Sequence, residues 1–370
     1  MRIYLDNAAT TAVIPEALNA AEYAMTEAFG NASSVHEMGR EAGKLLADSR
    51  KTLAELLSVE PQTLFFTSGG TESINTAILG AAYKNKHLGK HIVSTAIEHD
   101  ATLNTIRELK ADGFEVTLIP PQKDGSVLLS DIENAIRPDT VFMSLMGVCN
   151  ETGALLPYDE AAKTLHAKNP RALFHLDAVQ LFCKRPLSLE NVDLCSFSGH
   201  KIGGLKGSGM LYIRKGLTIR PVFQGGGQES NMRSGTEAIP QIAAFSAAAK
   251  KRYAKLPETV ERFDKLKSLL LNTLNASGIK YALNSPEVAS SHIVNISPCV
   301  LRSEVLIRML SDRGIFVSGG SACSRGKKSH VLTAMKKPAD NIDAALRVSF
   351  CPENTENDVL AFCKALCEVL

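Results

Sequence analysis

The chain has 370 residues, of which 45% are hydrophobic and 22% are charged, and its formal net charge at pH 7 is +2. This length exceeds what one hydrophobic core usually spans, so we expect one large domain and a smaller one. A net charge so close to zero argues against a dedicated nucleic-acid surface, and the sequence has no run of eighteen consecutive apolar residues. We therefore expect neither direct nucleic-acid binding nor a membrane span.

Eight cysteines are scattered through the chain without the paired spacing of a zinc site or of a disulfide framework. Cys363 and Cys367 lie four residues apart, which would place two metal ligands on one helix face, but packing within the helix is the favoured interpretation, and we predict no metal site. The scattered thiols indicate a reducing compartment. Since the N-terminal residues MRIYLDNAATT lack the apolar run of a signal peptide, we expect a cytoplasmic protein.

Helical spacing first appears over 15–28 and 39–57, after an N-terminal segment, 1–14. From 64 to 213, β-rich runs then alternate with helical stretches. The predicted strands are LFFTS, HIVST, FEVTLI, TVFMSLM, ALFHL, DLCSF and GMLYI, with helices starting at Thr71, Ala101, Ser130 and Tyr158. Such alternation predicts an α/β fold with a mostly parallel sheet covered by helices on both faces.

Two long helices, predicted over 239–255 and 258–277, connect this region to a C-terminal lobe. The lobe contains the predicted strands IKYAL, HIVNI, IFVS and ALRVSF, a helix over 303–313 and a last helix from Thr355. This order predicts a small α/β lobe with a mixed or antiparallel sheet. We place the large domain at 15–256 and the small C-terminal domain at 257–370.

Lys201 lies in the segment CSFSGHKIGGLKGSG, where a predicted strand enters a glycine-rich loop. A lysine at a strand end among small residues can lie near a ligand and be partly desolvated, which lowers its pKa and lets its amine attack a carbonyl. Taken alone, this pattern is weak, and an ordinary surface lysine explains it better.

The segment FFTSGGTESIN, 65–75, reads as a strand, a Gly-Gly turn and a helix start. Free backbone amides and the positive end of the helix dipole suit a phosphate group there, and Thr71 can add a hydroxyl. The simpler alternative is a capped helix in which Thr71 and Ser73 satisfy backbone donors. A phosphate cradle together with a Schiff-base lysine indicates pyridoxal 5′-phosphate.

Two further polar residues follow apolar strands. Asp177, in FHLDAVQ, would keep a pyridine nitrogen protonated, so that the ring can absorb electrons from a breaking bond; its alternative role is a helix cap. His99, in IEHD, has a flat ring that can stack on a cofactor and move protons, although most single histidines do neither.

Nine short segments occur in a fixed order along nearly the whole chain. They are YLDNAATT (4–11), FTSGGTES (66–73), IEHD (97–100), NETG (150–153), HLDAVQ (175–180), SGHK (198–201), GGGQE with RSGTE (225–229 and 233–237) and SGGSAC (318–323). SGHK alone is modest evidence, but the ordered set is very specific. In this order the set resembles the NifS/IscS-type cysteine desulfurases of the class V aminotransferase group.

The resemblance implies a fold-type I pyridoxal-phosphate homodimer that converts L-cysteine to L-alanine and keeps the sulfur as a persulfide. Lys201 then matches the Schiff-base lysine, Asp177 the partner of the pyridine nitrogen, and His99 the stacking and acid/base histidine. The remaining matches are Gln180 as donor to the ring hydroxyl, Gly70, Thr71, Ser198 and His200 as phosphate ligands, Thr236 as the phosphate contact from the other subunit, and Asn150 and Arg347 as substrate-binding residues. Arg347 is expected to bind the substrate carboxylate with two parallel hydrogen bonds.

By the same resemblance, Cys323 matches the nucleophile that accepts the sulfur. Free cysteines usually lie in cores, whereas Cys323 stands in the glycine-, serine- and lysine-rich stretch VSGGSACSRGKKSHV. Gly319 and Gly320 would let it move, and the basic residues Arg325, Lys327 and Lys328 would favour the thiolate. The alternative is a solvated basic turn with an incidental cysteine.

Three classes of function remain open at this point. The first is a cysteine desulfurase that passes sulfur to an acceptor protein, either an iron–sulfur scaffold or a tRNA-thiolation enzyme. The second is a selenocysteine lyase or another class V aminotransferase with the same cofactor site, and the third is a scaffold without turnover. Lys201, Asp177 and His99 together argue against the scaffold, and Cys323 within SGGSAC argues against plain transamination.

Overall fold

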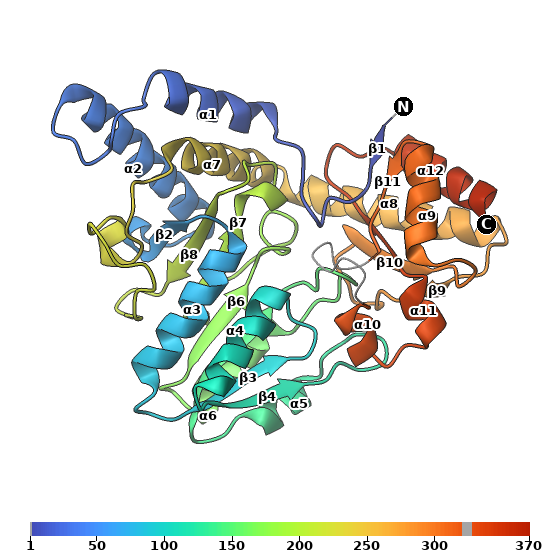
Figure 1. Cartoon of the computed structure of the whole chain (residues 1–370), viewed down its shortest axis with the longest axis horizontal. Helices are drawn as coiled ribbons and strands as arrows, with labels where there is room; N and C mark the ends of the chain where they lie inside the picture. Colours follow the sequence, from blue (N-terminus) through green and yellow to red (C-terminus); the bar gives the residue numbers. More distant parts are fainter. Residues whose placement is uncertain (1, 320–327) are drawn as a thin grey trace.

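The computed structural model describes residues 2–319 and 328–370, and a seven-stranded sheet lies at its centre (Figure 1). Its strands follow the order β2-β8-β7-β6-β5-β3-β4. Their bounds are β2 Leu64–Thr67, β3 His91–Thr95, β4 Glu115–Ile119, β5 Thr140–Met146, β6 Leu173–Asp177, β7 Leu194–Ser198 and β8 Gly209–Ile213. All the predicted strands of this region are present; three have the predicted bounds, and the bounds of the other four differ by one residue.

Strands β4, β3, β5, β6 and β7 run parallel, and only β8 is antiparallel to its neighbours β7 and β2. Strand β5, TVFMSLM, is buried at every residue, as are β3, β6, β7 and β8. Such continuous burial is what helices on both faces impose on a parallel sheet. The predicted α/β fold with a mostly parallel sheet is therefore confirmed.

Helices cover the two faces of this sheet (Figure 1). Their bounds are α1 Pro15–Thr26, α2 Glu37–Leu57, α3 Gly70–Asn85, α4 Asp100–Ala111, α5 Leu129–Ala135, α6 Tyr158–Lys168 and α7 Ile239–Tyr253. Ile74 and Ile78 of α3 share a core with Phe142 and Leu211 of the sheet. A separate core joins Phe245 of α7 to residues of the sheet's other face. The functional side chains thus extend from a sheet that is fixed on both sides.

The C-terminal part contains a three-stranded antiparallel sheet in the order β12-β10-β9. Its elements are α8 Leu256–Ala276, β9 Ala282–Leu283, β10 Ile293–Ser297, α9 Ser303–Asp312, β11 Ile315–Phe316, α10 His330–Ala334, α11 Ala339–Asp343, β12 Leu346–Ser349 and α12 Glu356–Val369. Helix α12 begins with a capping box between Thr355 and Asp358. The predicted small lobe is present, and the short helices α10 and α11 were not predicted.

Strand β1, Ile3–Tyr4, is the main element that sequence reasoning missed. It pairs in parallel with β11, and Ile3 and Leu5 join the core of the C-terminal part. The residues just after β1 then reach the large sheet, where the backbone amide of Thr11 donates to the His200 carbonyl over 2.9 Å. The N-terminal segment therefore links the two parts of the molecule, and the boundary at 256/257 stays a prediction.

Within 2–319 and 328–370, no helix has both the length and the apolar character that crossing a bilayer requires.

Gly209 supports the turn from β2 into α3, because a Cβ atom at this position would lie 2.5 Å from the Cα of Gly69. We expect Gly209→Ala to displace that turn and to destabilise the fold by about 1–3 kcal/mol, as overpacked cores do. Gly43→Ala in α2 is the matched control, because its Cβ would meet only the Ala32 carbonyl oxygen at 3.4 Å. Thermal unfolding of both variants tests this, and equal midpoints would contradict it.

Candidate functional site

Polar side chains from several elements converge where the parallel strands end, which is where open α/β sheets usually bind ligands. They surround a cavity of about 210 Å³. The cavity is lined by Ala8, Ala9, Gly70, Thr71, Ile74, His99, Met146, Val148, Asn150, Asp177, Val179, Gln180, Ser198, His200, Lys201 and Arg347. Ten of the twelve site residues predicted from the sequence are in this set; Thr236 is not, and Cys323 lies outside the described residues.

One end of the cavity presents an unusual set of donors. Gly69 precedes α3 with φ of 156°, a conformation that residues with side chains rarely adopt, and a Cβ on Gly70 would lie 2.9 Å from Val179 Cγ2. The Ser198 hydroxyl is buried and has no hydrogen-bond partner among the described residues. Helix amides, a hydroxyl without a partner and the ring of His200 together suit a phosphate group.

Lys201 closes the short helix η2, Gly199–Lys201, and extends into the same cavity. Its Nζ atom donates to the carbonyl oxygens of Ala8, over 2.8 Å, and Ala9, over 2.7 Å. Neighbouring His200 accepts or donates a hydrogen bond at Nδ1 with the Thr10 hydroxyl over 3.0 Å. Burial, followed by the charge of Lys201, lowers the pKa of His200 to about 4, so this ring is neutral at pH 7.

Asp177 and His99 lie on the sheet side of the cavity. Asp177 ends β6, and its Oδ1 accepts a hydrogen bond from the Val179 amide over 2.9 Å. Burial raises the pKa of Asp177. The hydrogen bond from Val179 and the nearby His99 and Lys201 oppose this rise. Burial also lowers the pKa of His99, whose Nδ1 accepts from the Ala101 amide over 3.1 Å. When neutral, His99 therefore carries its proton on Nε2.

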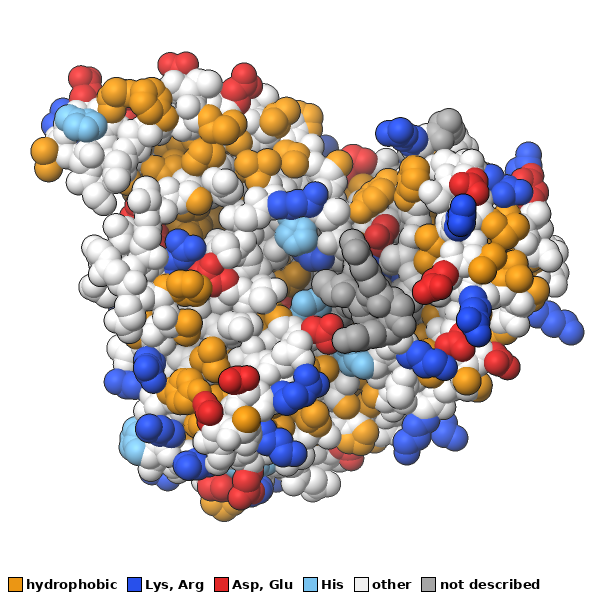
Figure 2. All heavy atoms as spheres, viewed as in Figure 1, with side chains coloured by type: hydrophobic (Ala, Val, Ile, Leu, Met, Phe, Trp, Pro, Cys, Tyr) orange, Lys and Arg blue, Asp and Glu red, His pale blue; other side chains and the backbone are white. Residues whose placement is uncertain are grey.

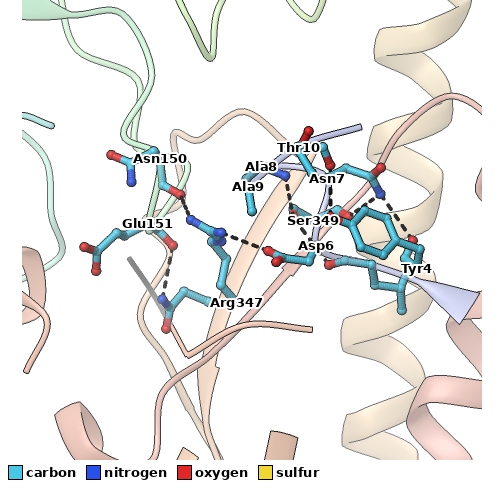
Figure 3. Close-up of polar contacts among 12 residues, drawn as sticks. Tyr4, Asp6, Asn7, Ala8, Ala9, Thr10, Asn150, Glu151, Arg347 and Ser349 are labelled. Atoms are coloured by element: carbon cyan, nitrogen blue, oxygen red, sulfur yellow. Dashed lines mark hydrogen bonds and ion pairs between the residues drawn. The ribbon is translucent and has the colours of Figure 1, made fainter. Parts of the chain in front are cut away.

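Arg347 of β12 is 1% exposed and joins three separate chain segments (Figure 3). Its Nη2 donates to Asp6 over 2.9 Å, and its Nη1 donates to the Asn150 carbonyl oxygen over 2.8 Å. The guanidinium Nε and the Asn150 Oδ1 are both buried and have no hydrogen-bond partner within the described residues. Arg347 and Asn150 thus offer one donor and one acceptor to a small polar ligand.

Thr236 lies outside the cavity and is exposed in the single chain. Its neighbours Gly235 and Glu237 line a separate, shallow hollow with Ser68, next to the turn that leads into α3. Cys323 belongs to residues 320–327, outside the described part of the chain, as do Gly320, Arg325 and Lys327.

Sequence reasoning missed the part played by Asp6 and by the carbonyls of Ala8 and Ala9. The motif YLDNAATT is recognisable, but nothing in one sequence shows that the backbone oxygens of residues 8 and 9 meet a lysine 193 and 192 positions away. The position of this segment depends on strand β1, which pairs with β11 and fixes where the segment starts. The described residues contain no group of three or more His, Cys, Asp or Glu side chains that could hold a metal ion.

Comparison with known proteins places this geometry in a family. A model of the class V aminotransferases matches residues 3–362. A cysteine desulfurase IscS of Methanosarcina thermophila is 40% identical over 96% of this chain and 89% of its own length. A putative cysteine desulfurase IscS 1 of Bacillus subtilis is 37% identical over 100% of this chain and 98% of its own.

Solved structures agree with this grouping. A NifS-like protein has a TM-score of 0.94 and 37% identity, covering 100% of this chain and 99% of that one. The structure of SspA in complex with cysteine has a TM-score of 0.83 and 30% identity, covering 95% of this chain and 100% of that one. The chain therefore belongs to the class V aminotransferase family and, within it, to the NifS/IscS-type group, whose cofactor is pyridoxal 5′-phosphate.

The residues present fit that cofactor. A phosphate matches the α3 amides and the Ser198 hydroxyl, a carboxylate stands at Asp177, and an amine stands at Lys201. The aliphatic and ring side chains of Ile74, Val179 and His99 supply flat or apolar walls. The predicted fold-type I architecture and its cofactor are thus confirmed.

Glu98, directly before His99, is fully buried beneath the site, and burial raises its pKa to about 8. The folded protein therefore keeps this carboxyl protonated up to about pH 8, whereas the unfolded chain releases the proton near its ordinary pKa. The stability of the wild type must fall as pH rises from about 5 to 8, by roughly a few kcal/mol from this group.

In Glu98→Gln the titratable carboxyl group is replaced by an amide, so this loss of stability with rising pH should disappear. We therefore expect the melting temperature of the variant to rise relative to that of the wild type between pH 6 and pH 8.5. Glu22→Gln on exposed α1 is the control and should show no such trend. A difference between Glu98→Gln and wild type that stays constant with pH would mean that Glu98 is ionised in the folded state.

Proposed function

We propose that the protein is a cysteine desulfurase that converts L-cysteine to L-alanine and retains the sulfur on Cys323 as a persulfide. The observation that carries the proposal is the convergence of Lys201, Asp177, His99 and Arg347 on one cavity in a chain of the NifS/IscS-type group. The cysteine in the SspA structure, a relative at 30% identity, supports the choice of substrate.

We assign the cofactor contacts by chemistry. The phosphate would be held by Gly70, Thr71, Ser198 and His200. Thr236 of a second copy would add the last phosphate contact. Asp177 would hold the pyridine nitrogen, Gln180 would donate to the ring hydroxyl, His99 would lie against the ring, and Lys201 would bind the cofactor covalently through its amine. Bound pyridoxal 5′-phosphate takes up the electron pair released when a bond at the Cα of the amino acid breaks.

The amino-acid substrate then lies between Lys201 and Arg347. Arg347 binds the substrate carboxylate through its guanidinium, positioned by Asp6 and the Asn150 carbonyl, and the Asn150 side chain adds a polar contact. The amine of Lys201 would take the proton from Cα of the substrate and would return protons later. His99, with its proton on Nε2, is the second acid/base group at the cavity.

Sulfur transfer requires a nucleophile, and we assign that role to Cys323. Its thiolate forms a bond to the substrate sulfur, and the bond from that sulfur to the substrate Cβ breaks. The electron pair stays with the carbon fragment, which takes up protons and leaves as alanine. One cysteine thus yields one alanine and one persulfide, with no external oxidant or reductant.

A homodimer is part of the proposal. Hydrophobic side chains gather over α1 and α2 (Figure 2). On α1 and just after it, Leu18, Tyr23, Met25 and Phe29 are each more than half exposed. Apolar surface of this kind on a single chain marks an interaction site. The exposed Thr236 offers a contact to the phosphate site of a second copy, as the family resemblance implies.

We further propose that the persulfide sulfur passes to an acceptor protein, either an iron–sulfur scaffold or a tRNA-thiolation enzyme. A cytoplasmic location suits this role. The seven cysteines that the structure describes are all free thiols, the state that a reducing compartment maintains.

The test is alanine production from L-cysteine by the purified holoenzyme. We expect catalytic formation of alanine and a visible absorbance band, both lost in Lys201→Ala because the amine that binds the cofactor is gone. Selenocysteine, assayed in parallel, separates a desulfurase from a selenocysteine lyase. A cofactor-loaded protein that turns over selenocysteine but not cysteine, or neither, would overturn the proposal.

A further inference from the structure

The side-chain amide of Gln180 has partners on both of its polar atoms. Its Nε2 donates to the Ala8 carbonyl oxygen over 2.8 Å. Its Oε1 accepts from the Nζ of Lys184 over 2.9 Å and lies 3.4 Å from the Nε2 of His292. Gln180, Lys184 and His292 are all buried. Gln180 also lines the cavity, whereas Lys184 does not, so Lys184 stands behind the wall of the site.

These partners allow one orientation of the amide. A glutamine can turn over and exchange its oxygen and nitrogen, and only the hydrogen-bond network decides between the two. A flipped amide would place its oxygen against the Ala8 carbonyl oxygen and its N–H₂ group against the lysine donor. In the observed orientation, Nε2 uses one of its two N–H bonds on Ala8, and the second is left for a ligand in the cavity.

The same Ala8 carbonyl also accepts the hydrogen bond from Lys201. Gln180 and Lys201 therefore share one backbone oxygen, and a change in one alters the position of the other. The Gln180 amide and the Lys201 amine each lie 2.8 Å from this oxygen. Because both contact one atom, they lie on adjoining parts of the cavity wall.

The backbone before Lys184 explains how a lysine comes to be buried there. Cys183 has φ of 59°, in the left-handed region that residues other than glycine and asparagine avoid. Such a conformation costs of order 1 kcal/mol and persists only where the surroundings enforce it. The turn brings the next residue, Lys184, back toward Gln180, four positions earlier, and its Nζ also lies 3.4 Å from the Val179 carbonyl oxygen.

We propose that Lys184 is a positioning residue that fixes the Gln180 amide with an N–H directed at the cofactor's ring oxygen, with His292 as the second donor to Gln180 Oε1. The inference rests on the proposed cofactor site and deepens it. Burial lowers the pKa of Lys184 to about 7, and both the ammonium and the neutral amine keep an N–H for this bond. The positioning role therefore does not depend on the charge of Lys184.

The experiment compares Lys184→Met, Gln180→Leu and the double variant with the wild-type holoenzyme. The first measurement is the rate at which cofactor is released on dilution, followed through the visible band. Losing one hydrogen bond should speed release about fivefold to tenfold in each single variant. The second measurement is the pH midpoint of the band. A donor stabilises negative charge on the ring oxygen, so its loss should shift that midpoint in both single variants.

The double variant decides between mechanisms. If Lys184 acts through Gln180, Lys184→Met should change neither release nor midpoint further in the Gln180→Leu background. Independent effects that multiply would overturn the proposal and indicate that the lysine acts directly as a buried charge. Lys267→Met, a half-buried lysine on α8 outside the cavity lining, is the control and should match the wild type.

Two further outcomes are distinguishable. A wild-type protein that binds no cofactor would contradict the proposed function itself, whereas normal binding with unchanged Lys184→Met would contradict only this inference. If Lys184→Met does not fold, His292→Leu removes the other donor to Gln180 Oε1 and should shift the midpoint in the same direction. No shift in that variant would count against the arrangement.

Discussion

The amine of Lys201 lies 2.8 and 2.7 Å from the carbonyl oxygens of Ala8 and Ala9, and this contact joins the two halves of the molecule. The same short segment is anchored on the other side, where the Ala8 amide donates to the Ser349 hydroxyl of β12 over 2.9 Å. Figure 3 shows the segment beside Arg347, which holds Asp6. A partly buried lysine requires acceptors, and here backbone oxygens supply them without adding a negative charge to the cavity.

Burial of charged and polar groups is the second constraint on the site. Asp177 and Glu98 have raised pKa values, whereas His99 and His200 have lowered ones, and burial is the largest cause in all four. Such shifts cluster at functional sites because catalysis needs groups whose protonation differs from that in water. The cavity wall therefore combines imidazole rings whose neutral form burial favours with the carboxyl group of Asp177 and the amine of Lys201.

Much of the fold could be predicted because its signals are local. Alternating strands and helices with turn residues between them gave the large sheet, and Lys201 and Asp177 could be placed because each follows a recognisable strand. Strand β1 escaped because two residues carry no periodicity. The Asp6–Arg347 ion pair joins residues 341 positions apart, a distance over which one sequence offers no pairing signal. Domain limits and the individual roles of the site residues remain predictions.

Lys184 shows the same limit in another form. In the sequence, Lys184 and Arg185 form a charged pair within LFCKRP, and such a pair is typical of a solvated surface. Nothing in the sequence marks Cys183 as the residue in the left-handed region that turns Lys184 inward. Glycine or asparagine at position 183 would have given a turn signal. Buried positioning residues of this kind follow from tertiary packing, so sequence motifs identify the groups that face the ligand and miss the groups behind them.

The central claim is that sulfur from L-cysteine is transferred to Cys323, and the most direct test is the intact mass of the protein after brief incubation with L-cysteine without reductant, alongside Cys323→Ala. We expect the wild type to gain the mass of one sulfur atom and the variant to gain none. A cofactor-loaded wild type without that gain, or an equal gain in Cys323→Ala, would contradict the account.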